Sequence, residues 1–102
     1  MNKIEHLLVC LSEECAEIIK IADKALRFGL GSSHPCEPGS NYERIEHEIN
    51  DLYGVIEVLS QHGIYFPRDD RQVKDKIEKI RHYMEYAEAR GTIRTEGGEI
   101  IT

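Results

Sequence analysis

The stretch KIEHLLVCLSEECAEIIKIADKALRF, residues 3–28, decides the fold class of this chain. Its apolar side chains recur every three or four positions, at Ile4, Leu7, Leu8, Leu11, Cys15, Ile18, Ile19, Ala22 and Leu26. This is the period of a helix with one apolar face, and no part of the stretch alternates as a half-buried strand does. Asn2 and Glu5 have the spacing of an N-terminal cap, and Gly29 suits the end of a helix. We therefore expect a long amphipathic helix near Lys3–Phe28.

A second helix is predicted after a loop that is rich in helix breakers. Residues 29–40 contain three Gly, two Pro and three Ser. Ser40 and Glu43 have the spacing of a capping box, which marks a helix start, and Gly63 is the expected end. Between them the apolar positions have helical spacing and comprise Ile45, Ile49, Leu52, Val55, Ile56 and Leu59.

A third helix is predicted to begin near Asp69 and to run to about Arg90. Pro67, Asp69 and Gln72 together form the start signal. The apolar side chains again share one face and comprise Val73, Ile77, Ile80, Tyr83, Met84 and Ala87. Residues 91–102 carry weak signals, and we expect a tail, a short hairpin or an arm onto another subunit.

These elements predict an all-α protein, an antiparallel helical bundle with three main helices in one domain, residues 1–90. A chain of 102 residues has the length of one domain and is too short for two independent cores. Three helices with apolar faces this long do not close one dry core. We therefore expect a four-helix core completed by oligomerisation, as a homodimer or homotetramer.

The composition and charge of the chain argue against two classes of binding partner, nucleic acids and membranes. Thirteen Lys and Arg against nineteen Asp and Glu give a net charge of −6, the wrong sign for binding a phosphate backbone, so no nucleic acid partner is expected. The apolar run Leu7–Leu11 is followed at once by Ser12 and two glutamates, so no membrane partner is expected either. Three cysteines without paired spacing indicate reduced thiols. These features predict a cytoplasmic protein, in a bacterium or, if phage-encoded, in its host.

Acidic residues interrupt the predicted apolar faces. At about 100° per residue, Glu48 lies between Val55 and Leu59, inside the apolar face of the second helix, and Asp51 lies on its edge. An ionised carboxylate that is removed from water must be paired, bound to a metal or protonated. Glu48 therefore needs a chemical explanation.

The first helix carries a matching acid pair. Glu14 and Glu17 lie at the edge of its apolar face, one turn apart, as Glu48 and Asp51 do, whereas Glu13 points more nearly outward. Antiparallel packing would bring four carboxylates together, and a divalent cation would relieve their repulsion. Because no Cys or His lies in register with them, all-oxygen ligation favours Mg²⁺ or Mn²⁺ over zinc. Such acid pairs also occur by chance on solvated helices, and for either pair alone this interpretation stays open.

The motif Glu13-Glu14-Cys15-Ala16-Glu17, followed by Glu48-Ile49-Asn50-Asp51, resembles the E-E-x-x-E and E-x-x-D signature of the MazG-like all-α nucleoside triphosphate pyrophosphohydrolases. The resemblance continues through residues 24–29 and Asn41-x-x-Arg44 to Leu59. It implies a dimeric or tetrameric enzyme that uses Mg²⁺ to hydrolyse nucleoside or deoxynucleoside triphosphates to the monophosphate and pyrophosphate. It assigns the metal ligands to Glu14, Glu17, Glu48 and Asp51, and it leaves Glu13 as the remaining catalytic acid, a candidate for orienting water.

The substrate would also need fixed positive charge near its outer phosphates. The candidates are Lys76, Lys79 and Tyr83 on the third helix and Lys24 and Arg27 at the end of the first. A lysine beside an apolar face often extends to solvent instead. The five histidines are scattered, and we expect solvated or packing roles for them, although His34 in the loop could touch a ligand.

Two alternatives stay open. A phosphoribosyl-ATP pyrophosphohydrolase would share the metal chemistry, and no sequence feature selects it. A non-catalytic helical interaction module would use its apolar faces to bind a partner helix. Glu48 argues against the module, because such a protein has no reason to place an ionisable group inside its apolar face. The base and sugar depend on pocket shape, which periodicity does not reveal.

Overall fold

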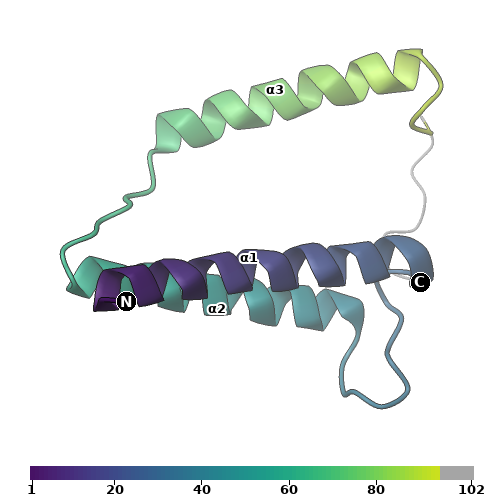
Figure 1. The fold of residues 1–102 in the computed structure, drawn as a ribbon. Coiled ribbons are helices and arrows are strands. Elements are labelled where there is room, and N and C mark those ends of the chain that lie inside the picture. Colours follow the sequence, from purple (N-terminus) through teal and green to yellow (C-terminus); the bar gives the residue numbers. More distant parts are fainter. Residues whose placement is uncertain (95–102) are drawn as a thin grey trace. The chain divides into compact units, whose positions relative to one another are not determined.

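The computed structural model describes residues 1–94, and within this range the chain forms three α-helices (Figure 1). They are α1 (Lys3–Phe28), α2 (Asn41–Gln61) and α3 (Asp70–Ala89). The described residues contain no strand beyond one isolated bridge between Ser33 and Ser40 in the loop. The all-α prediction is thus confirmed, with three helices at the predicted places. Of the predicted tail, residues 95–102 lie outside the described range.

The helix ends are set by local hydrogen bonds. Asn2 accepts the backbone N–H of Glu5 at 2.8 Å at the start of α1. Ser40 and Glu43 form the predicted capping box, each side chain accepting the other's backbone N–H at 3.2 Å. Gly29 ends α1 with a φ of 105°, a backbone conformation that favours glycine. These contacts join residues close in sequence, which is why the sequence predicted the boundaries.

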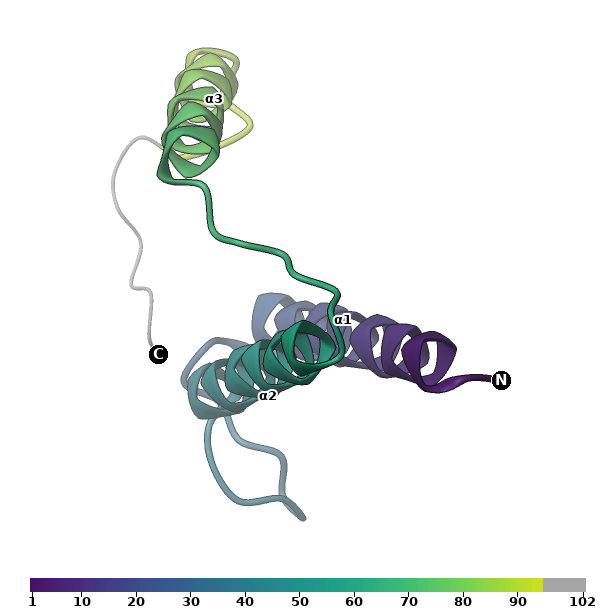
Figure 2. The same ribbon diagram turned by 90° about the vertical axis from the view of Figure 1, so that its left-hand side faces the viewer.

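The chain divides into two compact units, Met1–Phe66 and a second one that begins at Pro67. In the first unit α1 and α2 lie side by side and run antiparallel (Figures 1 and 2). Accordingly, Lys3 near the start of α1 lines a hollow with His62 just after α2, and Phe28 at the other end lines one with Asn41. The second unit contains α3. The single domain over residues 1–90 stays a prediction.

The residues through which α1 and α2 pack against each other recur every three or four positions along each helix. We call this packed surface the seam and define it by the half-buried and buried positions that follow this spacing on each helix, whereas other half-buried positions, such as Arg44 and Asp51, lie beside it. On α1 they are Ile4, Leu7, Leu11, Glu14, Ile18, Ile21 and Ala25, and on α2 they are Ile45, Glu48, Leu52, Val55 and Leu59. This spacing is typical of helices that pack along their length. Among the apolar residues described, only Ile21 and Leu59 are fully buried.

Much of the predicted apolar surface stays exposed. On α1 the outer side chains of Ile19 and Leu26 are 67% and 85% exposed. On α3 no residue is buried, and Ile77, Ile80 and Met84 are all exposed. Two helices bury too little apolar surface to form a stable core of their own.

We expect light scattering at micromolar concentration to return the mass of a dimer or a larger oligomer, since contiguous exposed apolar surface promotes association. Charges on the outer face of α1, introduced by Ile19→Glu together with Leu26→Glu, should shift the mass toward that of one chain. Lys20→Glu, a change of charge beside Ile19, is the matched control and should leave the mass unaltered. A single-chain mass for the unmodified protein would contradict the expectation.

Candidate metal centre

Glu14 and Glu48 occupy the middle of the seam, one on each helix. Both side chains are half-buried, and the apolar spacing continues on either side of each, from Leu11 to Ile18 and from Ile45 to Leu52. The structure thus places Glu48 on the packed face, as predicted. It places Glu14 farther inward than the predicted edge position. Two acids at core positions without a basic partner cost folding free energy.

The pKa of Glu14 is raised above its ordinary value of 4.5. Burial is the largest cause, because it disfavours the charged form, and a hydrogen bond between the Glu14 and Glu48 side chains adds to it. The negative charges of Asp51, Glu48 and Glu17 raise the pKa further. The other three acids that the sequence grouped therefore all act on Glu14 in the folded chain.

One oxygen of Glu14 lacks a partner within the described part of the chain. The Oε2 atom is buried and has no hydrogen bond there. Buried carboxylate oxygens usually have a donor or a cation, and an orphaned one needs an explanation. The charged neighbours that act on Glu14 are all acids, so a bound cation would supply the missing partner.

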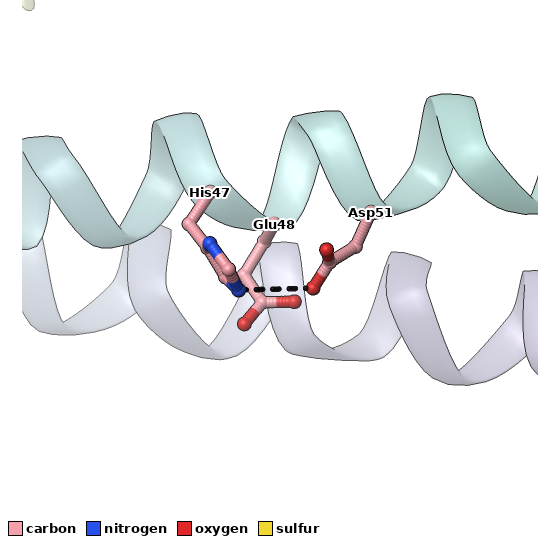
Figure 3. Close-up of side chains that lie close together, drawn as sticks. All are labelled: His47, Glu48 and Asp51. Carbon is pink, nitrogen blue, oxygen red and sulfur yellow. Dashed lines mark ion pairs between the residues drawn. The ribbon is translucent and has the colours of Figure 1, made fainter.

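On α2 a histidine joins the acids. His47, Glu48 and Asp51 each offer one ligand atom, and these atoms lie within 4.8 Å of one another. Figure 3 shows the three side chains on the same side of α2, with His47 Nε2 3.3 Å from Asp51 Oδ2. The His47 side chain is 73% exposed and that of Asp51 42%. This geometry resembles that of a metal site, although exposed acidic groups also cluster without one.

The expectation that no histidine lies in register with the acids is wrong. His47 lies four residues before Asp51, so both side chains project from the same face of α2. The four-residue interval between His47 and Asp51 is visible in the sequence. The donor set therefore contains an imidazole nitrogen besides carboxylate oxygens, so the all-oxygen argument for Mg²⁺ or Mn²⁺ over zinc loses its basis, because imidazole also suits zinc.

The remaining predicted acids lie on the exposed side of α1. Glu17 is exposed but close enough to influence Glu14, whereas Glu13 is exposed and has no part in the pKa shift of Glu14. Glu17 could reach an ion held at Glu14. Glu13 lies where its carboxylate stays in water.

The predicted basic residues fall into two groups. Lys24 lines a hollow of about 230 Å³ with Phe28 and Asn41, and Arg27 stacks on the ring of Phe28, 5.1 Å from its centre. In the second unit Lys76, Lys79 and Tyr83 line one hollow of about 410 Å³. Their predicted role at the outer phosphates stays a prediction.

Another basic side chain lies beside the acids and was missed in the sequence as a candidate. Arg44 lies one turn before Glu48 on α2, and both line a hollow of about 330 Å³. The four-residue interval between Arg44 and Glu48 identifies it in the sequence, because residues four positions apart share one face of a helix.

Comparison of the chain with models of known protein families finds no match, and neither curated proteins nor solved structures match it. Among residues 1–94, no helix has both the length and the apolarity that crossing a membrane requires. The resemblance to MazG-like enzymes therefore stays an expectation from the sequence motifs.

Proposed function

We propose that this chain is a metal-dependent nucleoside triphosphate pyrophosphohydrolase. It would hold Mg²⁺, or Mn²⁺ in its place, with Glu14, Glu17, Glu48 and Asp51. Its reaction would be hydrolysis of a nucleoside or deoxynucleoside triphosphate to the monophosphate and pyrophosphate. The observation that carries the proposal is the pair of half-buried glutamates in the seam, with the orphaned Oε2 atom of Glu14 between acidic neighbours.

The residues present fit a hard divalent cation. Carboxylate oxygens are its preferred ligands, and two helices supply them from facing surfaces. The orphaned oxygen of Glu14 and the mutual repulsion of the acids are both relieved by positive charge. Carboxylate oxygens also suit Mn²⁺, which can take the place of Mg²⁺, and His47 beside Asp51 adds a nitrogen donor.

When bound, the cation supplies Lewis-acid polarisation of a phosphoryl group and lowers the pKa of a bound water. The acids also exclude the substrate until their charge is neutralised, because a triphosphate carries about four negative charges. Glu13 is exposed on α1, and the resemblance leaves it as the candidate for orienting the attacking water.

The proposed bond cleavage can be tested with ¹⁸O-labelled water. Attack at the α-phosphorus makes pyrophosphate the leaving group, so the label should appear in the nucleoside monophosphate and not in pyrophosphate. The substrate should be the most active member of a panel of natural and modified triphosphates that includes phosphoribosyl-ATP. Label in pyrophosphate would show attack at the β-phosphorus, and label in orthophosphate would show removal of the γ-phosphate. Either result would overturn the mechanism.

The exposed apolar faces of α1 and α3 favour a second candidate, a helical interaction module without catalysis. Such a module would release no pyrophosphate from any member of the panel. It would also show no change in melting temperature with Mg²⁺. The enzyme proposal requires both pyrophosphate release and a change in melting temperature with Mg²⁺.

A further inference from the structure

Arg44 lines the same hollow as Glu48. Its side chain is only 21% exposed. The Nη2 atom forms an ion pair with Glu37 Oε2 at 2.7 Å, from the loop between α1 and α2. The Nη1 atom is buried and has no hydrogen-bond partner within the described residues. One half of the guanidinium is therefore fixed and the other half is unused.

The hollow around Arg44 is small, and four of its six lining residues have ionisable side chains. Its volume is about 330 Å³, at the lower end of the range for ligand pockets. It is lined by Pro38, Gly39, Glu43, Arg44, His47 and Glu48. A space of this size suits a phosphate chain better than a whole nucleotide.

The acids around this hollow do not account for the unused half of Arg44. Glu43 is engaged in the capping box, where its Oε1 atom accepts the N–H and O–H of Ser40, both at 3.2 Å. Glu48 projects into the seam beside Glu14. A buried donor without an acceptor costs about 1–3 kcal/mol, so a ligand that carries acceptor oxygens would be favoured there.

We propose that Arg44 binds the phosphate chain of the substrate, next to the acids that hold the metal. This inference rests on the proposed function and assigns the fixed positive charge of the site to α2, in addition to the predicted lysines. A guanidinium matches phosphate oxygens with two parallel N–H donors, which an ammonium does not. Glu37 orients the side chain by holding Nη2, and the four-residue interval places Arg44 and Glu48 on one face of the helix.

A purely structural role for Arg44 would have a different consequence. If the residue only tied the loop to α2 through Glu37, loss of either partner would have the same effect. If Arg44 binds phosphate, Glu37→Gln keeps the guanidinium and should preserve binding, whereas Arg44→Ala should abolish most of it. The two variants therefore separate the two roles.

The test is calorimetric titration of the full chain with inorganic tripolyphosphate in the presence of Mg²⁺, which measures phosphate binding without a base. Arg44→Ala should weaken binding about 10- to 100-fold, as expected for loss of a hydrogen-bonded charge. Arg44→Lys should recover part of that loss, and Glu37→Gln should stay within about threefold of the unmodified protein. Arg81→Ala, which removes an exposed arginine on α3, is the control and should bind as the unmodified chain does.

Equal binding by Arg44→Ala and the unmodified chain would overturn the inference, as would a Glu37→Gln variant that loses as much as Arg44→Ala. If Arg44→Ala fails to fold, judged by helix content, Arg44→Lys decides: an affinity equal to that of the unmodified chain overturns bidentate binding. Failure of the proposed function has a separate signature. The unmodified chain would then release no pyrophosphate from nucleotides, even where tripolyphosphate binding still depends on Arg44.

Discussion

Replacement of Glu48 by Gln, or of Asp51 by Asn, is expected to lower the rate of triphosphate hydrolysis by more than about a hundredfold. Each change removes a negative charge and one ligand oxygen but keeps the size of the side chain. Loss of a metal ligand removes the Lewis acid and the activated water together, and effects of this order follow. The rate of pyrophosphate release under saturating nucleotide and Mg²⁺ measures the effect.

The matched control for both variants is Glu57→Gln, an isosteric change at an exposed acid of the same helix. It should leave the rate within about twofold, because surface charge changes have small effects. Circular dichroism should give the same helix content for all three variants. Nearly normal hydrolysis in both Glu48→Gln and Asp51→Asn would refute the metal assignment.

Glu14 is expected to make the stability of the metal-free protein depend on pH. Its pKa is raised in the folded chain above the ordinary value of 4.5, chiefly by burial. As the pH falls, Glu14 therefore takes up a proton in the folded state at a higher pH than in the unfolded state. The melting temperature should rise as the pH is lowered from the raised pKa to 4.5. Above the raised pKa, Glu14 is ionised in both the folded and the unfolded state, and its destabilising effect on the folded state is complete.

Mg²⁺ should stabilise the protein at neutral pH for the same physical reason, since positive charge at the seam replaces the proton. A free Mg²⁺ concentration of about 100 times the dissociation constant raises the free energy of unfolding by about 2.7 kcal/mol. Glu14→Gln should raise the metal-free melting temperature, flatten its pH dependence and reduce the response to Mg²⁺. Scanning calorimetry of the variant and the unmodified chain, at several pH values with and without Mg²⁺, makes the comparison. A variant with an unchanged pH profile would show that Glu14 is not the group responsible.

The sequence alone predicted the parts of this protein that depend on neighbours along the chain. Helix boundaries follow from caps such as Asn2 and Ser40, whose partners lie three residues away. The position of Glu48 on the apolar face followed from helical periodicity, because angles around one helix are fixed by the backbone. The same rule places His47 and Asp51, four residues apart, on one face of α2.

The tertiary structure decided what depends on how two helices meet. Periodicity places Glu14 at the edge of the apolar face of α1 but does not say which positions of that face contact α2. In the packed structure Glu14 lies in the seam. The packing also leaves Ile19 exposed, although Ile19 belongs to the same predicted face. The contact line is chosen by side-chain fit between helices, and one helix taken by itself contains no information about that fit.

The pairing of Arg44 with Glu37 is the clearest case of a feature that only the tertiary structure decided. Glu37 belongs to a loop of Gly, Pro and Ser residues, whose path has no period from which a side-chain direction could be derived. Backbone contacts across the loop's base, from Asn41 N–H to Ser32 O and from Tyr42 N–H to Leu30 O, bring its ends together. Local propensity specifies where such a loop begins and ends, but the position of its carboxylate beside Arg44 depends on contacts formed only when the chain has folded.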